Sequence, residues 1–211
     1  MTRQNAAAGP ASHAIIPAST SDVDMLSHVI ADAFHPLDVS RWLIPDEAER
    51  RKRFPAYFRM YVEHAMADGL VHTTPGRTAA ALWIPGTGPA AAADGYAGQL
   101  AEITGPWVER FQVFDDELER HHLSGAEHHH LAILAVRPDR QGHGVGTALL
   151  SFHHAVLDEK GVPAYLEASA ADTRRIYLAH GYADFGTPIR LPGGPEMYPM
   201  LRQPAGSSNA R

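Results

Sequence analysis

The sequence predicts an α/β fold in which a single mixed sheet carries helices on its faces. Segments with apolar residues at helical spacing alternate with short apolar segments that are typical of strands. One strand–helix–strand crossover spans residues 130–168, and a crossover of this kind joins two parallel strands. With 211 residues, of which 45% are hydrophobic and 20% charged, the chain is long and apolar enough to bury one sizeable core.

The first half of the chain predicts a strand, two helices and a hairpin. Residues 13–17 favour a strand, and Ser21 begins a helix as part of a pattern that resembles a capping box. A polar break over residues 36–45 precedes a long helix that ends at Gly69. The hairpin has its turn at Pro75–Gly76, a dipeptide typical of turns.

The second half predicts four further helices and four strands. Two helices come first, and the second of them begins at Pro106. The remaining elements are a strand, a helix, a strand, a helix and two strands, over residues 130–136, 144–160, 162–168, 172–180, 183–190 and 196–201. In the helix over 144–160 we expect Phe152 on the buried face, and His153 and His154 on the surface or its flank.

Composition and charge exclude several classes of protein. A net charge of −6 argues against a general binder of nucleic acid or anionic membrane. The absence of cysteine excludes a disulfide scaffold, a thiolate metal site and a cysteine nucleophile. No apolar run approaches the roughly 18–20 residues of a membrane span, so we expect a cytoplasmic protein. We also expect a single domain over 13–203 between flexible tails at 1–12 and 204–211, and leave a homodimer open.

The stretch over residues 130–150 carries the most informative chemistry. An apolar strand leads into a turn with Gly142, Gly144 and Gly146, and the turn leads into a helix. Glycines let the backbone turn tightly, and the free N–H groups at a helix start attract an anion such as a pyrophosphate. The loop has neither the Gly-Lys-Ser/Thr ending of a Walker loop nor the G-x-G-x-x-G of a dinucleotide loop. Taken alone, the glycines would be better explained by a tight turn without a ligand.

The wider pattern resembles the GNAT superfamily of N-acetyltransferases. Val136-x-Pro-x-x-Gln-Gly-x-Gly-x-Gly146 matches the acetyl-CoA loop of that family, whose core is Arg/Gln-x-x-Gly-x-Gly/Ala. Tyr177-x-x-x-Gly-Tyr182 matches the family's Tyr-x-x-x-Gly-Phe/Tyr motif. The two motifs, separated by one helix and one strand, are together quite specific. The resemblance is strong over residues 128–201 and mostly architectural before that.

Within the superfamily the chain is most similar to the puromycin N-acetyltransferase branch, through residues 80–83, 138–146 and 161–169. The resemblance implies a twisted, mostly antiparallel sheet with a splayed central parallel pair, helices on both faces, and acetyl-CoA as co-substrate in the gap. The residues it implies for the cofactor are Leu134, Ala135, Val136, Gln141, Gly142, His143, Gly144, Val145, Gly146, Thr147 and Thr173. The chain departs from the family at Ala170 and Thr173, where relatives often have an asparagine that contacts the cofactor.

The same resemblance implies direct attack of an amine on the thioester, without an enzyme nucleophile. A backbone N–H near Val136 would stabilise the developing oxyanion, and Tyr177 would protonate the leaving thiolate. Glu167 lies among apolar neighbours on the strand over 162–168, and burial would raise its pKa and make it a base that acts through water. A structural carboxylate paired with an arginine is an equally good interpretation of Glu167.

Histidines and aromatic residues supply weaker candidates. The run 128–130, together with His121 and His122, suggests a metal site. Within the run only His128 and His130 can converge, because neighbouring residues of a strand face opposite sides. We favour polar histidines without a metal there, and any metal bound to them is expected to be irrelevant to activity. Among Trp83, Trp107, Phe111 and Phe114, which core packing would also explain, Trp83 is the best candidate for the wall of an acceptor site.

Three functions remain open. The leading interpretation is an acetyl-CoA-dependent N-acetyltransferase that acts on the primary amine of a small molecule, with an antibiotic among the candidates. The alternatives are an acetyltransferase of protein or peptide amino groups and a sensor module that binds acyl-CoA without turnover. The predicted Tyr177 acid favours catalysis, because a sensor needs no group that protonates a thiolate.

Overall fold

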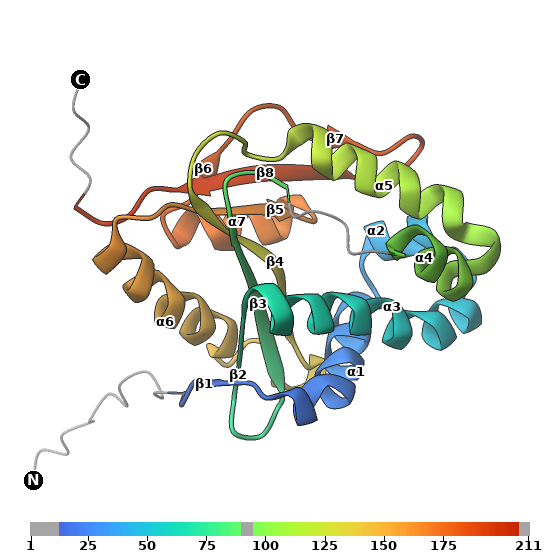
Figure 1. The fold of residues 1–211 in the computed structure, drawn as a ribbon, viewed down its shortest axis with the longest axis horizontal. Helices are drawn as coiled ribbons and strands as arrows, with labels where there is room; N and C mark the ends of the chain where they lie inside the picture. Colours follow the sequence, from blue (N-terminus) through green and yellow to red (C-terminus); the bar gives the residue numbers. More distant parts are fainter. Residues whose placement is uncertain (1–12, 90–94, 207–211) are drawn as a thin grey trace, which may run out of the picture.

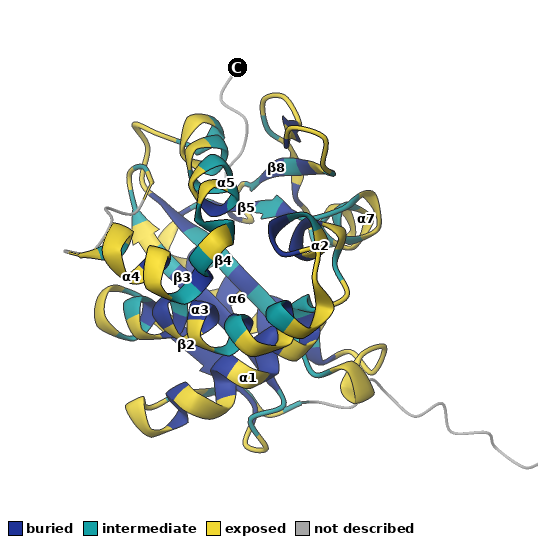
Figure 2. Ribbon diagram, turned by 90° about the vertical axis from the view of Figure 1, so that its right-hand side faces the viewer, coloured by how far each residue is buried: buried dark blue, intermediate teal, exposed yellow. Residues whose placement is uncertain are grey.

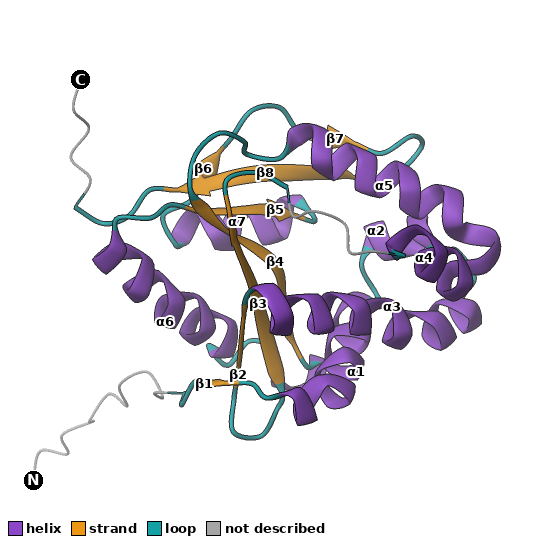
Figure 3. Cartoon of the chain, viewed as in Figure 1, coloured by secondary structure: helices purple, strands orange, loops and turns teal. Residues whose placement is uncertain are grey.

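The structure is a computed structural model that describes residues 13–89 and 95–206. The strands in chain order are β1 (Ile16–Pro17), β2 (Leu70–Thr73), β3 (Ala79–Gly86), β4 (His128–Val136), β5 (Ala164–Ala168), β6 (Ala183–Asp184), β7 (Ile189–Arg190) and β8 (Glu196–Arg202) (Figure 1). The helices are α1 (Val23–Phe34), α2 (Asp38–Leu43), α3 (Glu47–Asp68), α4 (Tyr96–Thr104), α5 (Val108–His121), α6 (Val145–Lys160) and α7 (Ala171–Ala179) (Figure 3). Short 3₁₀ turns cover Thr20–Asp22, Gly105–Trp107 and Pro138–Arg140.

The strands form one open sheet in the order β1-β2-β3-β4-β5-β8-β6, and β7 pairs with β8. Among the described residues β4 and β5 are the one parallel pair, and every other neighbouring pair is antiparallel. Helix α6 makes the connection between these two parallel strands, as the crossover in the sequence predicts. The predicted fold class is therefore confirmed. In the described part of the chain, no helix combines the length and the apolar character needed to cross a membrane.

The two faces of the sheet bury separate apolar clusters, visible as the dark central strands and inner helix faces in Figure 2. On one face, helices α1, α2, α3 and α5 pack against Leu82 and Ile133 of β3 and β4. On the other face, α6 packs against Trp83, Leu131 and Leu166. The sheet is thus a central layer between helices.

A β-bulge in β4 reverses which residues of that strand face which side. The pairing of β3 with β4 shifts between Leu82 and Trp83, which leaves Ala132 as the extra residue. Leu131 therefore packs with α6, whereas Ile133, two positions later, packs with α1 and α3. A regular strand would have placed both on one face.

Several local expectations need correction. Helix α2 occupies the segment that was expected to be a break. The first helical turn begins earlier than Ser21, because the Ser19 N–H donates to Asp22 Oδ2 at 2.9 Å. The single strand expected over 183–190 is two short strands, β6 and β7, which both pair with β8.

The expected tails lie mostly outside the described residues, which exclude 1–12 and 207–211. The described start of the C-terminal tail is not free, however. Pro204 is buried, and the Ala205 N–H donates to Asp158 Oδ1 on α6 at 2.7 Å. Residues 204 and 205 therefore contact the rest of the protein, and the flexibility of the tail stays a prediction.

The buried face of α6 differs from the one expected. Phe152 is 42% exposed, whereas His153 and His154 are 1% and 6% exposed. His153 hydrogen-bonds to His72 at 3.0 Å and to His129 at 2.9 Å. Its ring stacks on Trp83 with centroids 4.1 Å apart. The surface assignment of both histidines was wrong. His153 hydrogen-bonds to histidines of β2 and β4, and His154 Nε2 hydrogen-bonds to the Tyr182 hydroxyl at 3.0 Å, and these bonds reduce the cost of burying the rings.

Burial keeps these two histidines uncharged. It lowers the pKa of His153 to about 3, with neighbouring His72 and His129 adding to the effect. It lowers the pKa of His154 to about 4, and Arg202 adds to the shift. In the unfolded chain a histidine has a pKa near 6.5, so below that pH the unfolded state binds more protons than the folded state. The stability that depends on these groups is complete above pH ~6.5 and is lost as the pH falls.

We therefore expect His153→Phe to flatten the pH dependence of stability. Titration of one such histidine removes about 2 kcal/mol of wild-type stability between pH 7 and pH 5, and the variant should lose correspondingly less. Urea unfolding at the two pH values measures this difference. His28→Phe, on the exposed face of α1, is the control and should keep the wild-type slope. An unchanged slope in His153→Phe would contradict the assignment.

Candidate active site

The parallel strands β4 and β5 pair only at their beginnings and then separate. His129 pairs with Ala164 and His130 with Tyr165, and no later residue of β4 pairs with β5. The bulge at Ala132 follows directly after the last paired region, and a bulge bends the strand that contains it. The predicted splayed pair is present.

A cavity of about 700 Å³ occupies this gap and continues through the sheet. One end lies at the glycine loop before α6, and the other, which we call the acceptor end, lies at His130 and Glu167. Aromatic side chains of α1, α3 and α5 wall the acceptor end: Phe34, Tyr57, Phe58, Tyr61 and Phe114.

The glycine loop lines the cavity through Gln141, Gly142, Gly144, Val145, Gly146 and Thr147. Gly142 and Gly144 have φ of +75° and +82°, the left-handed region that glycine alone adopts without strain. Gly144 is also the N-cap of α6, so the unpaired N–H groups of a 16-residue helix start at the cavity. This arrangement suits a phosphate group.

One predicted loop residue points elsewhere. His143 is exposed and is not among the residues that line the cavity. Its carbonyl oxygen is 2.7 Å from His13 Nε2, and its own ring Nδ1 donates to the Gln141 carbonyl at 2.7 Å. The side chain of His143 therefore contacts the loop itself, and its contact with the cofactor stays a prediction.

The predicted strand residues Leu134, Ala135 and Val136 all line the cavity. The Arg137 N–H donates to the Thr78 carbonyl beside β3. Leu134 and Val136 lie three residues and one residue earlier, and because successive N–H groups of a strand point to opposite sides, those of Leu134 and Val136 point away from β3. The Val136 N–H consequently faces the gap, away from β3. The Val136 carbonyl accepts a bond from the Gln141 amide at 3.0 Å. These backbone groups can bind an extended ligand that takes the place of a neighbouring strand.

Helix α7 brings Thr173 and Tyr177 to the same cavity. The Thr173 hydroxyl accepts from the Ala170 N–H at 3.0 Å, so it caps α7 as well as lining the cavity. Tyr177 packs edge-on against Tyr182, with ring centroids 5.6 Å apart. Burial raises the pKa of the Tyr177 phenol above its usual value, which keeps it protonated and able to donate.

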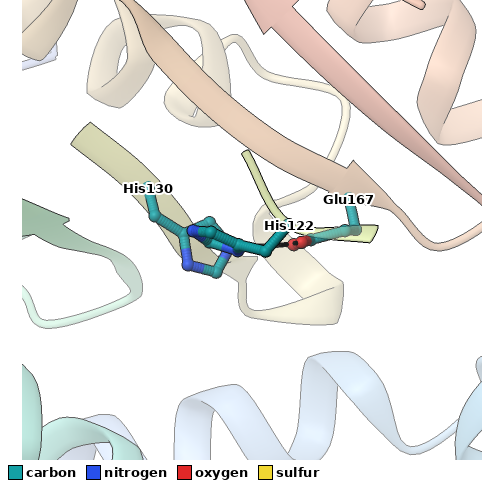
Figure 4. Close-up of side chains that lie close together, drawn as sticks. All are labelled: His122, His130 and Glu167. Carbon is teal, nitrogen blue, oxygen red and sulfur yellow. Dashed lines mark hydrogen bonds and ion pairs between the residues drawn. The ribbon is translucent and has the colours of Figure 1, made fainter. Parts of the chain in front are cut away.

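Glu167 is buried beside two histidines whose rings contact each other (Figure 4). His130 Nε2 lies 2.8 Å from Glu167 Oε2, and His122 Nδ1 lies 3.5 Å from Glu167 Oε1. Burial acts to raise the pKa of Glu167, but the influence of His130, and after it of His122, outweighs burial and holds that pKa well below the usual range. The expected rise was therefore wrong, and the partners are histidines where an arginine was considered.

The structure corrects the expected acceptor wall. Trp83 is fully buried under α6, on the side of the sheet away from the acceptor end, and does not line the cavity. Phe111 belongs to the core and Trp107 packs beside it, so Phe114 alone of the four candidates lines the cavity. The aromatic residues of α3 that do line it were visible in the sequence as a helical apolar face, but such a face does not reveal where its helix borders a cavity.

His128 and His130 do lie on one face, as expected, because both rings pack against His122 and Tyr165. His122 was considered in the sequence as a metal ligand together with the run 128–130, but it was not predicted to reach Glu167. Its approach depends on the turn between α5 and β4, which the pattern of the chain does not define.

Comparison with known proteins gives the family context. Residues 110–184 match the family described as the acetyltransferase (GNAT) domain. A protein described as histone acetyltransferase HPA2 and related acetyltransferase, from Corynebacterium glutamicum, superposes with a TM-score of 0.67 at 21% identity, over 93% of this chain and 99% of that one. Arylalkylamine N-acetyltransferase 2 from Aedes aegypti superposes with a TM-score of 0.61 at 12% identity, over 90% of this chain and 98% of that one.

The ribosomal-protein-S18-alanine N-acetyltransferase from Escherichia coli has a TM-score of 0.52 at 19% identity, over 94% of this chain and 98% of that one. At these identities the neighbours share the fold. Together with the domain match they support an N-acetyltransferase.

We expect Gly144→Val to abolish binding of acetyl-CoA. A β-branched residue cannot adopt φ of +82° without strain, and relaxation would turn the loop N–H groups away from the phosphates. Isothermal calorimetry with acetyl-CoA measures the loss. The matched control is Gly186→Val, which carries the same kind of strain at φ of +66° outside the cavity and should keep the wild-type affinity. Full affinity in a folded Gly144→Val protein would refute this binding site.

Proposed function

We propose that this chain, whose residues 110–184 match the acetyltransferase (GNAT) domain, transfers the acetyl group of acetyl-CoA to the primary amine of a small molecule. The observation that carries the proposal is the single cavity that joins the glycine loop to the Glu167–His130 pair through the gap between β4 and β5. Tyr177 lines the same cavity. Residues from α1 to β8 contribute to it, so the proposed catalytic unit is the whole of 13–203.

The donor end fits acetyl-CoA. When bound, acetyl-CoA supplies an acetyl group activated as a thioester. The start of α6 would hold the pyrophosphate, and the gap-facing backbone of Leu134 and Val136 would hold the extended arm. The N–H of Val136 is then the donor that stabilises negative charge on the acetyl oxygen, and the protonated Tyr177 is the donor to the leaving sulfur.

The acceptor end fits an amine. Glu167 stays ionised next to its histidines, so its negative charge attracts an ammonium group. Because its pKa is low, the carboxylate is a weak base and does not itself take the proton of the ammonium group. If His130 Nε2–H donates to Glu167, the second ring nitrogen of His130 carries a lone pair that can accept the acceptor's proton. In this assignment Glu167 contributes to deprotonation as the partner of His130, and the free amine attacks the thioester directly.

The aromatic wall favours a small acceptor with an apolar body. A neighbour of the same fold is described as an arylalkylamine N-acetyltransferase, and the similarity of the sequence to the puromycin branch adds antibiotic amines to the candidates. The net charge of −6 supports an acceptor that is neither nucleic acid nor membrane, and we keep the cytoplasm as the proposed location. A protein amino group is the alternative, since another neighbour is described as an S18-alanine N-acetyltransferase.

A thiol-release assay with a panel of amines tests the proposal. The panel contains arylalkylamines, aminonucleoside and aminoglycoside antibiotics, and peptides with a free N-terminus or lysine. We expect turnover with an apolar primary amine that exceeds turnover with every peptide. Peptide preference would favour the protein-acceptor alternative, and binding of acetyl-CoA without turnover of any amine would favour a sensor.

We expect Tyr177→Phe to slow acetylation by about 10²–10⁴-fold, because it removes the hydroxyl that assists the leaving thiolate and keeps the ring. Acetyl-CoA affinity and melting temperature should change little. Tyr198→Phe is the control, because that hydroxyl donates to Glu196 outside the cavity. A fully active Tyr177→Phe protein would leave Tyr177 with a packing role only.

A further inference from the structure

His122, His130 and Glu167 bring three possible metal ligands to one point beside the cavity (Figure 4). One nitrogen of each histidine and a carboxylate oxygen all lie within 4.8 Å of one another. They come from three segments that are distant in sequence: the end of α5, the start of β4 and the middle of β5. The side chains are 4%, 18% and 6% exposed, respectively.

The hydrogen bonds around His122 assign its tautomer. His128 Nδ1 must donate to the Ala126 carbonyl, 2.9 Å away, because a carbonyl only accepts. Uncharged His128 then presents a lone pair on Nε2, so His122 Nε2, at 3.1 Å, donates to it. This leaves the lone pair of an uncharged His122 on Nδ1.

That lone pair faces a carboxylate oxygen. His122 Nδ1 and Glu167 Oε1 are 3.5 Å apart, too far for an ordinary hydrogen bond. Glu167 Oε1 is buried and has no hydrogen-bond partner among the described residues. Two facing lone pairs repel each other, so the arrangement calls for a positive charge between them. Either an extra proton on His122 or a metal ion can provide it.

We propose that His122, His130 and Glu167 form a zinc-binding site at the acceptor end of the cavity. Two histidines and one glutamate are a ligand set that zinc accepts, with bonds of about 2.0–2.2 Å and therefore about 3.4 Å between ligand atoms in tetrahedral geometry. The separation of 3.5 Å at His122 already matches this value, and the 2.8 Å contact at His130 needs only a small side-chain rotation.

Supporting contacts beyond the three ligands also fit. His128 fixes the orientation of the His122 ring through its Nε2, the kind of outer contact that typically sets the ligand tautomer in zinc sites. His130 and Glu167 line the cavity, so a fourth ligand, water or an amine, can reach the ion from there. A site of this type is open on one side.

Zinc at this position inhibits acetyl transfer, in contrast to the expectation that a bound metal is irrelevant to activity, and this consequence rests on the proposed function. The ion takes Glu167 and the Nε2 lone pair of His130, so the ring proton of His130 moves to its other nitrogen, which can then no longer accept the proton of the acceptor amine. The chemistry itself needs no metal, so chelators should leave the zinc-free enzyme active and should restore activity to the zinc-loaded enzyme.

Binding is tested first, on the full chain purified without a histidine tag. Competition with a chromophoric chelator should give one zinc per chain. His122→Asn, His130→Asn and Glu167→Gln should each weaken zinc binding by more than about 100-fold. His128→Asn alters only the outer contact and should weaken zinc binding by about 10–100-fold. His64→Asn is the matched control, since His64 lies 3.4 Å from Asp68 on α3 without a third ligand, and it should bind zinc as tightly as the wild type.

A second measurement needs no variant. Cobalt(II) added to the wild-type chain should give the strong visible absorption of a four-coordinate ion and should be displaced by zinc. Absence of stoichiometric binding, or binding that survives loss of any of the three ligands, overturns the proposal. Because binding is read without turnover, an enzyme that acetylates no amine would count against the proposed function and not against the zinc site.

Discussion

β4 and β5 hydrogen-bond through two residue pairs and then part, and this separation of central strands organises the rest of the molecule. Backbone groups in the middle of a sheet normally pair with the next strand, because an unpaired buried N–H or C=O is costly. Here the later residues of β4 face a cavity of about 700 Å³. The fold tolerates these unpaired backbone groups because a ligand or water in the cavity can hydrogen-bond to them. In the structure the Gln141 side-chain amide donates to the Val136 carbonyl.

The bulge at Ala132 connects this opening to the two chemically different faces of β4. Before the bulge, His129 faces α6 and His130 faces the acceptor end. After it, Ile133 packs with α1 and α3, and Leu134 packs towards α6. One inserted residue therefore lets a single strand contribute a buried uncharged histidine to one core, a hydrogen-bond partner of Glu167 to the acceptor end, and backbone to the donor end.

The two histidine groups show how the surroundings decide the chemistry of one residue type. Around His153 the neighbours are Trp83 and other histidines, so nothing compensates a charge and burial favours the neutral ring. Around Glu167 the same type of side chain lies next to a buried, ionised carboxylate, whose negative charge attracts a cation. The acceptor end is consequently the place in the described cavity where a cation, whether ammonium, proton or metal, is stabilised.

The local pattern of the chain determined much of this protein. Periodicity, turn residues and motif spacing act over a few residues, and they define the elements from the hairpin at Pro75–Gly76 to the end of β5. They also place the start of α6 at the glycine loop and Tyr177 on α7. The opposite burial of Phe152 and His153 was not predictable in this way, because it depends on partners 81 and 24 residues away. The same holds for Trp83, whose face is set by its packing on α6, and for His122, which reaches Glu167 only once α5 and β5 are in place. Short-range spacing defines the elements and the donor loop, but the acceptor end is assembled by contacts between distant segments, and only the tertiary structure decides them.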